Sequence, residues 1–127
     1  MSYKLLVVDD DRDILDAVSS RLIRENYQVV VACDGEEALL RVKGDDPDIV
    51  ILDLMLPKLN GFDVLKRIRQ NYNDRWRPVI IISARNELES LKTCYELQAD
   101  HYLTKPCTFE KILQGIQTMI SLIPIRR

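Results

Sequence analysis

A chain of 127 residues, of which 46% are hydrophobic and 30% charged, has the size and balance of one soluble globular domain with its own core. A net charge of −2 excludes strong electrostatic attraction to nucleic acid or to an anionic membrane. No apolar run is long enough to cross a bilayer, and the amino terminus does not have the pattern of a secretory signal. Three widely spaced cysteines without metal-ligand spacing predict free thiols in a reducing cytoplasm.

In chain order, five short apolar runs alternate with five segments in which apolar residues recur at helical spacing. The runs are rich in β-branched residues, which is typical of strands buried on both faces of a parallel sheet. The expected strands cover residues 5–8, 28–32, 49–52, 78–83 and 101–104. The expected helices cover residues 14–23, 38–42, 62–68, 88–97 and 109–120. This alternation predicts an α/β fold, with a five-stranded parallel sheet, helices on both faces and right-handed crossovers.

Capping and turn residues mark several boundaries between these elements. Asp11 is expected to cap the first helix, Gly35 to break the chain before the second, and Asn60-Gly61 to turn it before the third. Residues 72–77 are expected to form a polar and aromatic connection. Pro124 is expected to end the last helix.

Polar side chains follow four of the five expected strands at the point where each strand ends. They are Asp9 and Asp10, Asp53, Ser83 and Lys105. The carboxyl ends of parallel strands lie along one edge of the sheet, where open α/β folds bind ligands. The sequence therefore predicts one constellation of three carboxylates, a hydroxyl and an ammonium.

This set of residue types favours phosphoryl chemistry. Adjacent carboxylates repel one another unless a cation lies among them, and oxygen ligands without histidine or cysteine suit Mg²⁺. An aspartate can act as the nucleophile that forms an aspartyl phosphate. A metal ion and a lysine would neutralise charge on the transferring oxygens, which is where much of the catalysis of phosphoryl transfer lies.

With these motifs in place, the chain resembles a response-regulator receiver domain of two-component signalling, of the CheY-like superfamily, over nearly its whole length. The matching motifs are Asp9-Asp10, Leu52-Asp53-Leu54-Met55-Leu56-Pro57, Asn60-Gly61, Ser83-Ala84 and Tyr102-Leu103-Thr104-Lys105-Pro106. The resemblance implies a doubly wound, flavodoxin-like (βα)₅ fold with strand order 2-1-3-4-5. It also implies that residues 1–127 form a single receiver domain, with a core of about residues 3–122 and no output domain.

The resemblance implies a role for each residue of the acidic site. Asp53 would be the phosphoacceptor, assisted by Lys105. Asp10, Asp53 and the backbone carbonyl of Met55 would bind Mg²⁺ or Mn²⁺, and Asp9 would contribute mainly through water. The phosphoryl group would come from a sensor histidine kinase or a phosphotransfer protein. Such a domain is a signalling switch that promotes only its own phosphorylation and dephosphorylation, and not a turnover enzyme.

The resemblance also implies a switch. Ser83 would turn toward the phosphoryl group, and Tyr102 would rotate inward behind it. The face formed by the helix over 88–97, the strand over 101–104 and the helix over 109–120 would then change shape for a downstream protein. A monomer or a phosphorylation-dependent dimer fits this scheme, without direct contact to nucleic acid or membrane.

Three positions near the site distinguish this chain within that family. Cys107 follows Lys105-Pro106, whose peptide bond the resemblance implies to be cis, at a position where the family very often has Phe. In this family, the positions that Met55 and Arg85 occupy tune the lifetime of the phosphoryl group. An apolar methionine and a cationic arginine there should crowd the path of attacking water and lengthen that lifetime.

Two other functions stay open. Asp9-Asp10-Asp11 contains an Asp-x-Asp after the first strand, as in phosphohydrolases of the haloacid-dehalogenase type, which would use Asp9 and leave Asp53 without a role. The chain could also be a pseudo-receiver that binds partners without phosphorylation, although the complete acid set argues against this. Gln114-Gly115 stands near where DNA-binding relatives commonly carry an interface arginine, so a transcription-factor-like dimer is unsupported.

Overall fold

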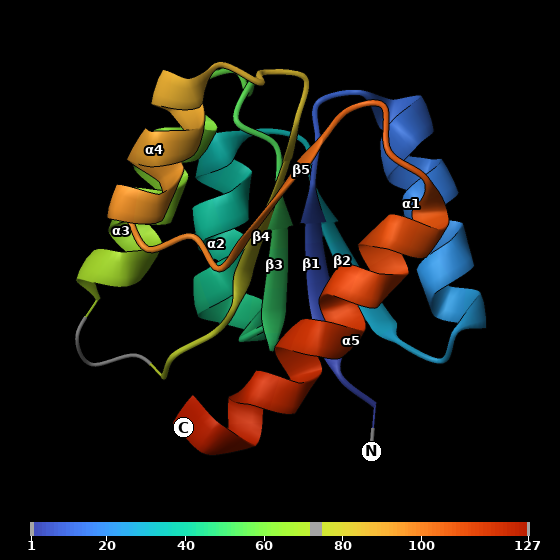
Figure 1. The fold of residues 1–127 in the computed structure, drawn as a ribbon. Helices are drawn as coiled ribbons and strands as arrows, with labels where there is room; N and C mark the ends of the chain where they lie inside the picture. Colours follow the sequence, from blue (N-terminus) through green and yellow to red (C-terminus); the bar gives the residue numbers. More distant parts are fainter. Residues whose placement is uncertain (1, 72–74, 127) are drawn as a thin grey trace.

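The computed structural model describes residues 2–71 and 75–126, and within them five parallel strands alternate with five helices (Figure 1). The strands are β1 (Lys4–Val8), β2 (Gln28–Ala32), β3 (Ile49–Leu52), β4 (Val79–Ser83) and β5 (His101–Thr104). The helices are α1 (Arg12–Arg24), α2 (Gly35–Asp45), α3 (Gly61–Gln70), α4 (Leu88–Glu96) and α5 (Phe109–Arg126). The strand order is β2-β1-β3-β4-β5, which confirms the predicted doubly wound, flavodoxin-like topology.

Helices cover both faces of the sheet, with α1 and α5 on one face and α2, α3 and α4 on the other (Figure 1). Alternation along each strand supplies both cores, because successive side chains point to opposite faces. In β1, for example, Leu6 and Val8 pack with the α2, α3 and α4 side, whereas Leu5 and Val7 pack with the α1 and α5 side. The central strands are therefore buried on both faces, as their apolar runs predict.

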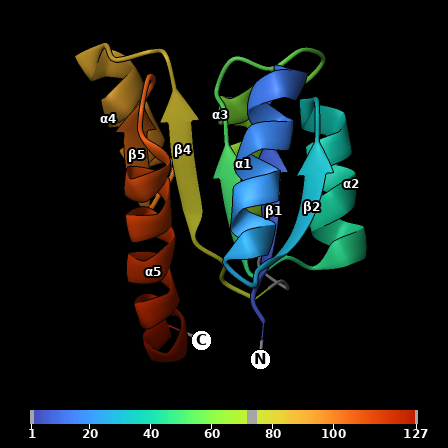
Figure 2. The ribbon, with the colours of Figure 1, turned by 90° about the vertical axis from the view of Figure 1, so that its right-hand side faces the viewer.

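The strands share one direction, so the sheet has two chemically different edges. The carboxyl ends of the strands lie together at one end of the molecule, and both chain termini lie at the other (Figures 1 and 2). Every functional residue predicted at a strand end therefore belongs to the upper end in these views. This end is called the carboxyl edge below, and the opposite end the amino edge.

The predicted cap of α1 is confirmed, and Asn60, which was expected only to turn the chain, caps α3 in the same way. The Asp11 carboxylate accepts hydrogen bonds from the backbone N–H groups of Asp13 at 3.0 Å and Ile14 at 3.3 Å. The Asn60 side chain likewise accepts one from the backbone N–H of Asp63 at 3.0 Å. These bonds satisfy N–H groups that the first turn of a helix leaves without an intrahelical partner.

Two boundary predictions were wrong. Gly35 does not break the chain but is the first residue of α2. Pro124 does not end α5, which continues through it to Arg126. A proline lacks the N–H that would donate to the carbonyl four residues earlier, and its ring crowds that carbonyl. Pro124 lies in the last turn of the helix with an exposed ring, where few helical hydrogen bonds remain to be lost, so the helix tolerates it there.

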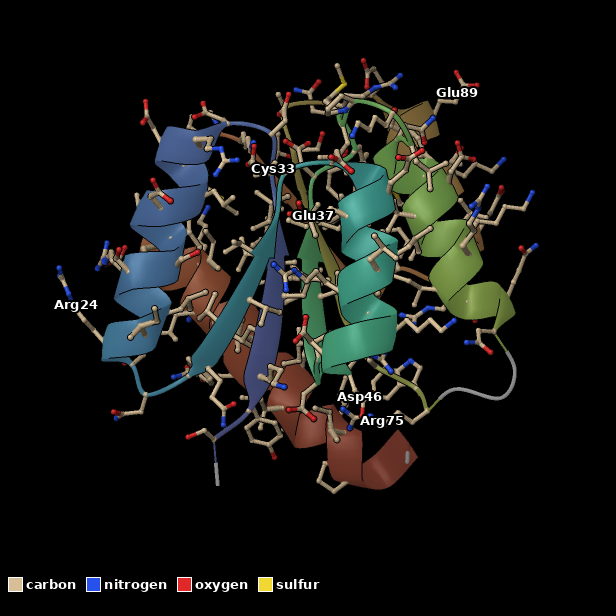
Figure 3. The ribbon with its side chains drawn as sticks, turned by 180° about the vertical axis from the view of Figure 1, so that it is seen from behind. Arg24, Cys33, Glu37, Asp46, Arg75 and Glu89 are labelled. Atoms are coloured by element: carbon tan, nitrogen blue, oxygen red, sulfur yellow. The ribbon has the colours of Figure 1, made fainter. Side chains whose placement is uncertain are left out.

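The amino edge is closed by ion pairs that sequence reasoning missed. Arg77, which was expected in a polar connection, is only 1% exposed. Its guanidinium donates to the Pro47 carbonyl at 3.0 Å and to the Asp46 carboxylate at 2.9 Å. Arg75 also bonds Asp46, at 3.0 Å, and Figure 3 shows these two residues together at the lower end of the molecule. Residues 72–74 of the expected connection lie outside the described residues.

A second pair reinforces this edge. Arg69 of α3 donates to the Asp100 carboxylate at 2.6 Å, and the same carboxylate accepts the backbone N–H of Val79 at 2.8 Å. The amino-edge network, as the term is used below, consists of Asp46, Asp48, Asp100, Arg69, Arg75 and Arg77. It ties α3 and the loops before β3, β4 and β5 to the base of the sheet.

Candidate functional site

The two central carboxylates lie next to each other because β1 and β3 are neighbours in the sheet. Val8 pairs with Leu52 at the ends of these strands, so the residues that follow them, Asp9 and Asp53, leave the sheet side by side. The backbone N–H of Asp53 still donates to the Val8 carbonyl at 3.1 Å, and both side chains are buried. The rigid ladder thus continues up to the two acids.

Each of these carboxylates is held in the same way. One oxygen accepts a backbone N–H two residues ahead, from Asp11 to Asp9 at 2.9 Å and from Met55 to Asp53 at 3.0 Å. The other oxygen of each accepts the Lys105 ammonium, at 2.8 Å in both cases. Lys105 therefore bridges the two acids, and its contact with Asp9 is one that sequence reasoning missed. No local pattern signals it, because it depends on the register of β1 against β3.

The Lys105 ammonium is stabilised in its charged form. Partial burial would lower its pKa, but hydrogen bonds and charge from Asp53 and Asp9 outweigh that desolvation, so the pKa lies above its ordinary value. The ammonium is thus a fixed positive charge beside the Asp53 carboxylate throughout the physiological pH range.

Asp10 completes an acidic cluster with Asp9 and Asp53. Each can offer a carboxylate oxygen within 4.8 Å of the others, and Asp10 is exposed while the other two are buried. Three carboxylates face one ammonium, so the cluster retains negative charge. Its ligand atoms are all hard oxygens, with one open side toward solvent at Asp10, and this donor set fits Mg²⁺ or Mn²⁺.

Ser83 and Tyr102 are joined to this site through the loop after β4. Ser83 is fully buried, its hydroxyl accepts the backbone N–H of Arg85 at 3.3 Å, and its carbonyl accepts the backbone N–H of Lys105 at 2.8 Å. The hydroxyl of Tyr102 donates to the Arg85 carbonyl, and burial raises the pKa of this phenol. A displacement of the Ser83 loop would therefore reach Tyr102 through a direct hydrogen bond.

Met55 and Arg85 lie together beside the exposed acid Asp10. Both line a cavity of about 380 Å³ that also includes Asp10 and Phe62, and the Met55 side chain is 55% exposed. The Arg85 guanidinium lies 5.7 Å from the centre of the Phe62 ring. The Lys105–Pro106 peptide bond is cis, as the resemblance implied.

Cys107 is a half-buried side chain beside this site. Burial raises the pKa of its thiol, so it is protonated near neutral pH, as a packing side chain would be.

Two glycines hold the loop that carries Met55. A side chain at Gly35 would place its Cβ 1.8 Å from the Leu59 carbonyl oxygen, and one at Gly61 would lie 2.3 Å from the Asp53 carbonyl oxygen. Lys58 adds an ion pair of 3.5 Å to Asp34, the cap of α2. The close approach of Gly35 to the Leu59 carbonyl was not predicted from the sequence. The only sequence signal for it is that Gly35 directly follows the capping residue Asp34.

The fold and the site define a receiver domain of the response-regulator family. The sequence model of the family described as "Response regulator receiver domain" matches residues 5–117, so the chain belongs to this family. None of the described helices combines the length and the apolar character that crossing a membrane requires.

Particular relatives agree with this assignment. The chain is 42% identical over 120 residues to the alkaline phosphatase synthesis transcriptional regulatory protein PhoP of Bacillus subtilis, covering 94% of this chain and 49% of that protein. It is 34% identical to the response regulator MprA of Mycobacterium tuberculosis, covering 94% and 51%. The chain thus spans about half the length of these curated relatives.

Solved structures show the same fold. A CheY-like receiver domain protein from Methanospirillum hungatei superposes with a TM-score of 0.93 over 100% of both chains, at 24% identity. The receiver domain of the Francisella response regulator 1452 superposes with a TM-score of 0.86, covering 94% of this chain and 98% of that one, at 32% identity.

Proposed function

We propose that this receiver domain accepts a phosphoryl group on Asp53 and uses it to switch a protein-binding face. The observation that carries the proposal is the bridge of Lys105 between Asp53 and Asp9, with 2.8 Å to each carboxylate, beside the exposed acid Asp10. This arrangement supplies a nucleophile, a fixed cation and an acidic ligand set within one group of side chains.

In the proposed reaction, a carboxylate oxygen of Asp53 attacks the phosphorus of a phosphorylated donor. A new O–P bond forms, the bond between phosphorus and the donor breaks, and the donor keeps that electron pair. As negative charge develops on the phosphoryl oxygens, the Lys105 ammonium can move one hydrogen bond from Asp53 to a phosphoryl oxygen. It can keep its hydrogen bond to Asp9 while it does so. The backbone N–H of Met55 fixes the orientation of the Asp53 carboxylate before attack.

Asp10, Asp53 and the backbone carbonyl of Met55 would hold Mg²⁺ or Mn²⁺, and Asp9 would contribute through water. When bound, the ion neutralises charge on the transferring oxygens. The close carboxylates support this assignment, since three of them lie within 4.8 Å of one another and Lys105 pairs with only two, Asp9 and Asp53.

The phosphoryl group would then act on the β4–α4 loop. Ser83 would leave the N–H of Arg85 to donate its hydroxyl to a phosphoryl oxygen, and Tyr102 would follow through its bond to the Arg85 carbonyl. We assign the output to the face formed by α4, β5 and α5, which carries Tyr102. Phosphate shifts the balance only to the extent that it interacts differently with the two states.

The partners follow from the family. A sensor histidine kinase or phosphotransfer protein would supply the phosphoryl group, and a downstream protein would bind the α4–β5–α5 face of a monomer or of a phosphorylation-dependent dimer. Direct contact of this domain with nucleic acid is not expected at a net charge of −2. The domain would catalyse only its own phosphorylation and dephosphorylation, in the cytoplasm.

The test is incubation with Mg²⁺ and a small phosphodonor such as acetyl phosphate, followed by intact-mass measurement. Wild type should gain one phosphoryl group that is stable in acid and lost in base, whereas Asp53→Asn should gain none. Asp16→Asn, an exposed acid of α1, is the matched control and should behave like wild type.

Asp9→Asn separates the alternatives. It should slow labelling of Asp53 without abolishing it. Loss of the label in Asp9→Asn alone would indicate a hydrolase of the haloacid-dehalogenase type, and no label in wild type would indicate a pseudo-receiver; either result contradicts the proposal.

A further inference from the structure

An apolar cavity of about 410 Å³ lies beside the acidic site, on the face covered by α1 and α5. Its floor is formed by four side chains that are all less than 9% exposed, and they come from β1, β3, β4 and α5. They are Val7, Ile51, Ile82 and Ile112. Val18 of α1 and Cys107, just before α5, form its sides. The cavity belongs to the range of volumes that small-molecule sites commonly have.

The charged side chains at the polar end of the cavity are already paired with one another. Asp9, Asp53 and Lys105 line that end, and the Lys105 ammonium is already paired with both carboxylates at 2.8 Å. A charged ligand would lose hydration in the apolar part and would have to compete with these existing pairs. The lining therefore favours an uncharged, largely apolar ligand.

The volume indicates how large such a ligand can be. An apolar cavity of roughly 150 Å³ is known to stay dry and to bind benzene. A cavity of about 410 Å³ therefore has room for a bicyclic aromatic ring system. A flat aromatic ring also suits a space bounded by isoleucine and valine side chains, which it can contact on both faces.

The cavity contacts both segments that move in the proposed switch. Ala84 follows Ser83, Pro106 follows Lys105, and both line the cavity. A molecule packed against these two residues restrains the backbone that follows β4 and the backbone that follows β5, both on the same side of β3 and Asp53 in the sheet. Phosphorylation that requires Ser83 and Lys105 to move would then be slower.

We propose that this cavity is a regulatory site that binds an uncharged bicyclic aromatic molecule and thereby slows phosphorylation of Asp53. The binding half of the proposal is independent of the proposed function, whereas the regulatory half rests on it. Binding is therefore measured without any phosphodonor.

The binding test uses indole as the probe and follows isoleucine methyl resonances in the full chain. We expect saturable shifts of Ile51, Ile82 and Ile112, which line the cavity, and none for Ile68 and Ile81, which belong to the core on the other face. Absence of saturable shifts, or equal shifts on both faces, overturns the proposed site.

Variants that change the size of the cavity sharpen the test. Cys107→Phe places a ring in the space and should weaken indole binding by about tenfold or more. Cys107→Ser, of nearly the same volume as cysteine, is the matched control and should bind like wild type. If Cys107→Phe does not fold, Val18→Phe fills the same space from the half-buried side of α1. Unchanged indole binding in a folded filling variant refutes the site.

The regulatory half is tested by the rate of labelling with acetyl phosphate at saturating indole. We expect labelling of wild type and of Cys107→Ser to slow severalfold, and labelling of Cys107→Phe to be insensitive to indole. Labelling that indole does not change, in a protein that binds it, overturns the regulation. If wild type cannot be labelled at all, the proposed function fails, and the methyl shifts still decide whether the site exists.

Discussion

The two edges of the sheet each carry a cluster of charged side chains, and the balance of positive and negative charge differs between them. At the carboxyl edge, the described residues place three carboxylates, Asp9, Asp10 and Asp53, around one ammonium, that of Lys105. At the amino edge, the described members of the network are three aspartates and three arginines. Both edges are built from loops that meet where the strands end, so topology alone does not distinguish them.

The difference teaches where function lies in this fold. A network whose charges balance among the described residues holds the loops in place through its own ion pairs. An unbalanced cluster holds like charges close together, which costs stability until a cation or a reaction relieves it. The comparison predicts that removing a charge of the network destabilises the amino edge, whereas neutralising one of the crowded carboxylates stabilises the carboxyl edge, as the following changes test.

The largest effect is expected for Arg77→Met. Arg77 is 1% exposed, and its loss removes the hydrogen bonds to the Pro47 carbonyl and to Asp46 inside the base of the sheet. The free energy of unfolding should fall by about 2–4 kcal/mol, measured by urea denaturation. Labelling of Asp53 in the folded protein should be unchanged. Arg67→Met, on the exposed side of α3, is the control, and a loss below about 1 kcal/mol for Arg77→Met contradicts the role of the network.

A matched pair of aspartate substitutions should move stability in opposite directions. Asp53→Asn removes one of three crowded carboxylates and should raise the free energy of unfolding by about 1 kcal/mol in the presence of a chelator. Asp100→Asn weakens the acceptor of Arg69 and of the Val79 N–H, and should lower it by about 1–2 kcal/mol.

Magnesium should reverse the order of stability, so that wild type becomes more stable than Asp53→Asn. Binding at a concentration of about 100 times the dissociation constant stabilises a protein by about 2.7 kcal/mol. Wild type should gain this stabilisation in thermal unfolding and Asp53→Asn should gain much less. If both aspartate variants lose stability equally, or if magnesium leaves wild type unchanged, the two edges do not differ in the way proposed.

The carboxyl edge was largely predictable from the sequence, for a physical reason. Four of the five apolar runs ended in a polar residue, and parallel topology carries all such ends to one edge, so Asp9 and Asp53 had to meet there. Capping by Asp11 was predictable because it depends on residues within one turn. Local patterns and one topological rule were sufficient for these features.

The remaining features depend on distances in space that no local pattern encodes. Arg77 stands in a polar stretch, and only its approach to Asp46 and Pro47, about thirty residues away in the chain, makes it a buried side chain. The cavity beside Cys107 depends on the volumes of side chains from several elements. Gly35 is the most instructive case, because the carbonyl of Leu59 that requires a glycine comes from another loop.

At the carboxyl edge, exposed side chains should control access rather than stability. Met55 and Arg85 line the cavity next to Asp10, and replacing them by Asn and Ala opens the path of water to the phosphoryl group. Hydrolysis of the phosphorylated double variant should be faster by about tenfold, which corresponds to about 1.4 kcal/mol in activation free energy. The decay of the label after removal of the donor measures this rate. Lys92→Ala, exposed on α4, is the control. An unchanged or slower decay in the double variant contradicts a role of Met55 and Arg85 in excluding water.

The smallest effect concerns Asp46 and its dependence on pH. Partial burial would raise the pKa of this carboxyl, but hydrogen bonds and charge from Arg75 and Arg77 outweigh it and hold the pKa below its ordinary value. A lowered pKa stabilises the fold above the ordinary carboxyl pKa of about 3.9, and this stability is lost as the pH falls through the lowered value. The side chain is 60% exposed, so solvent screens the effect.

Asp46→Asn is a clean test because residue 46 has a φ of 48°, which asparagine tolerates well. At pH 7 the variant should unfold with a free energy lower by less than about 1 kcal/mol, and the difference should shrink as the pH falls below about 4. Urea denaturation at several pH values measures both. A difference that stays constant from pH 7 down to about 2 would show that the charge of Asp46 is not what holds the arginines, and that the amino edge owes its stability to neutral hydrogen bonds instead.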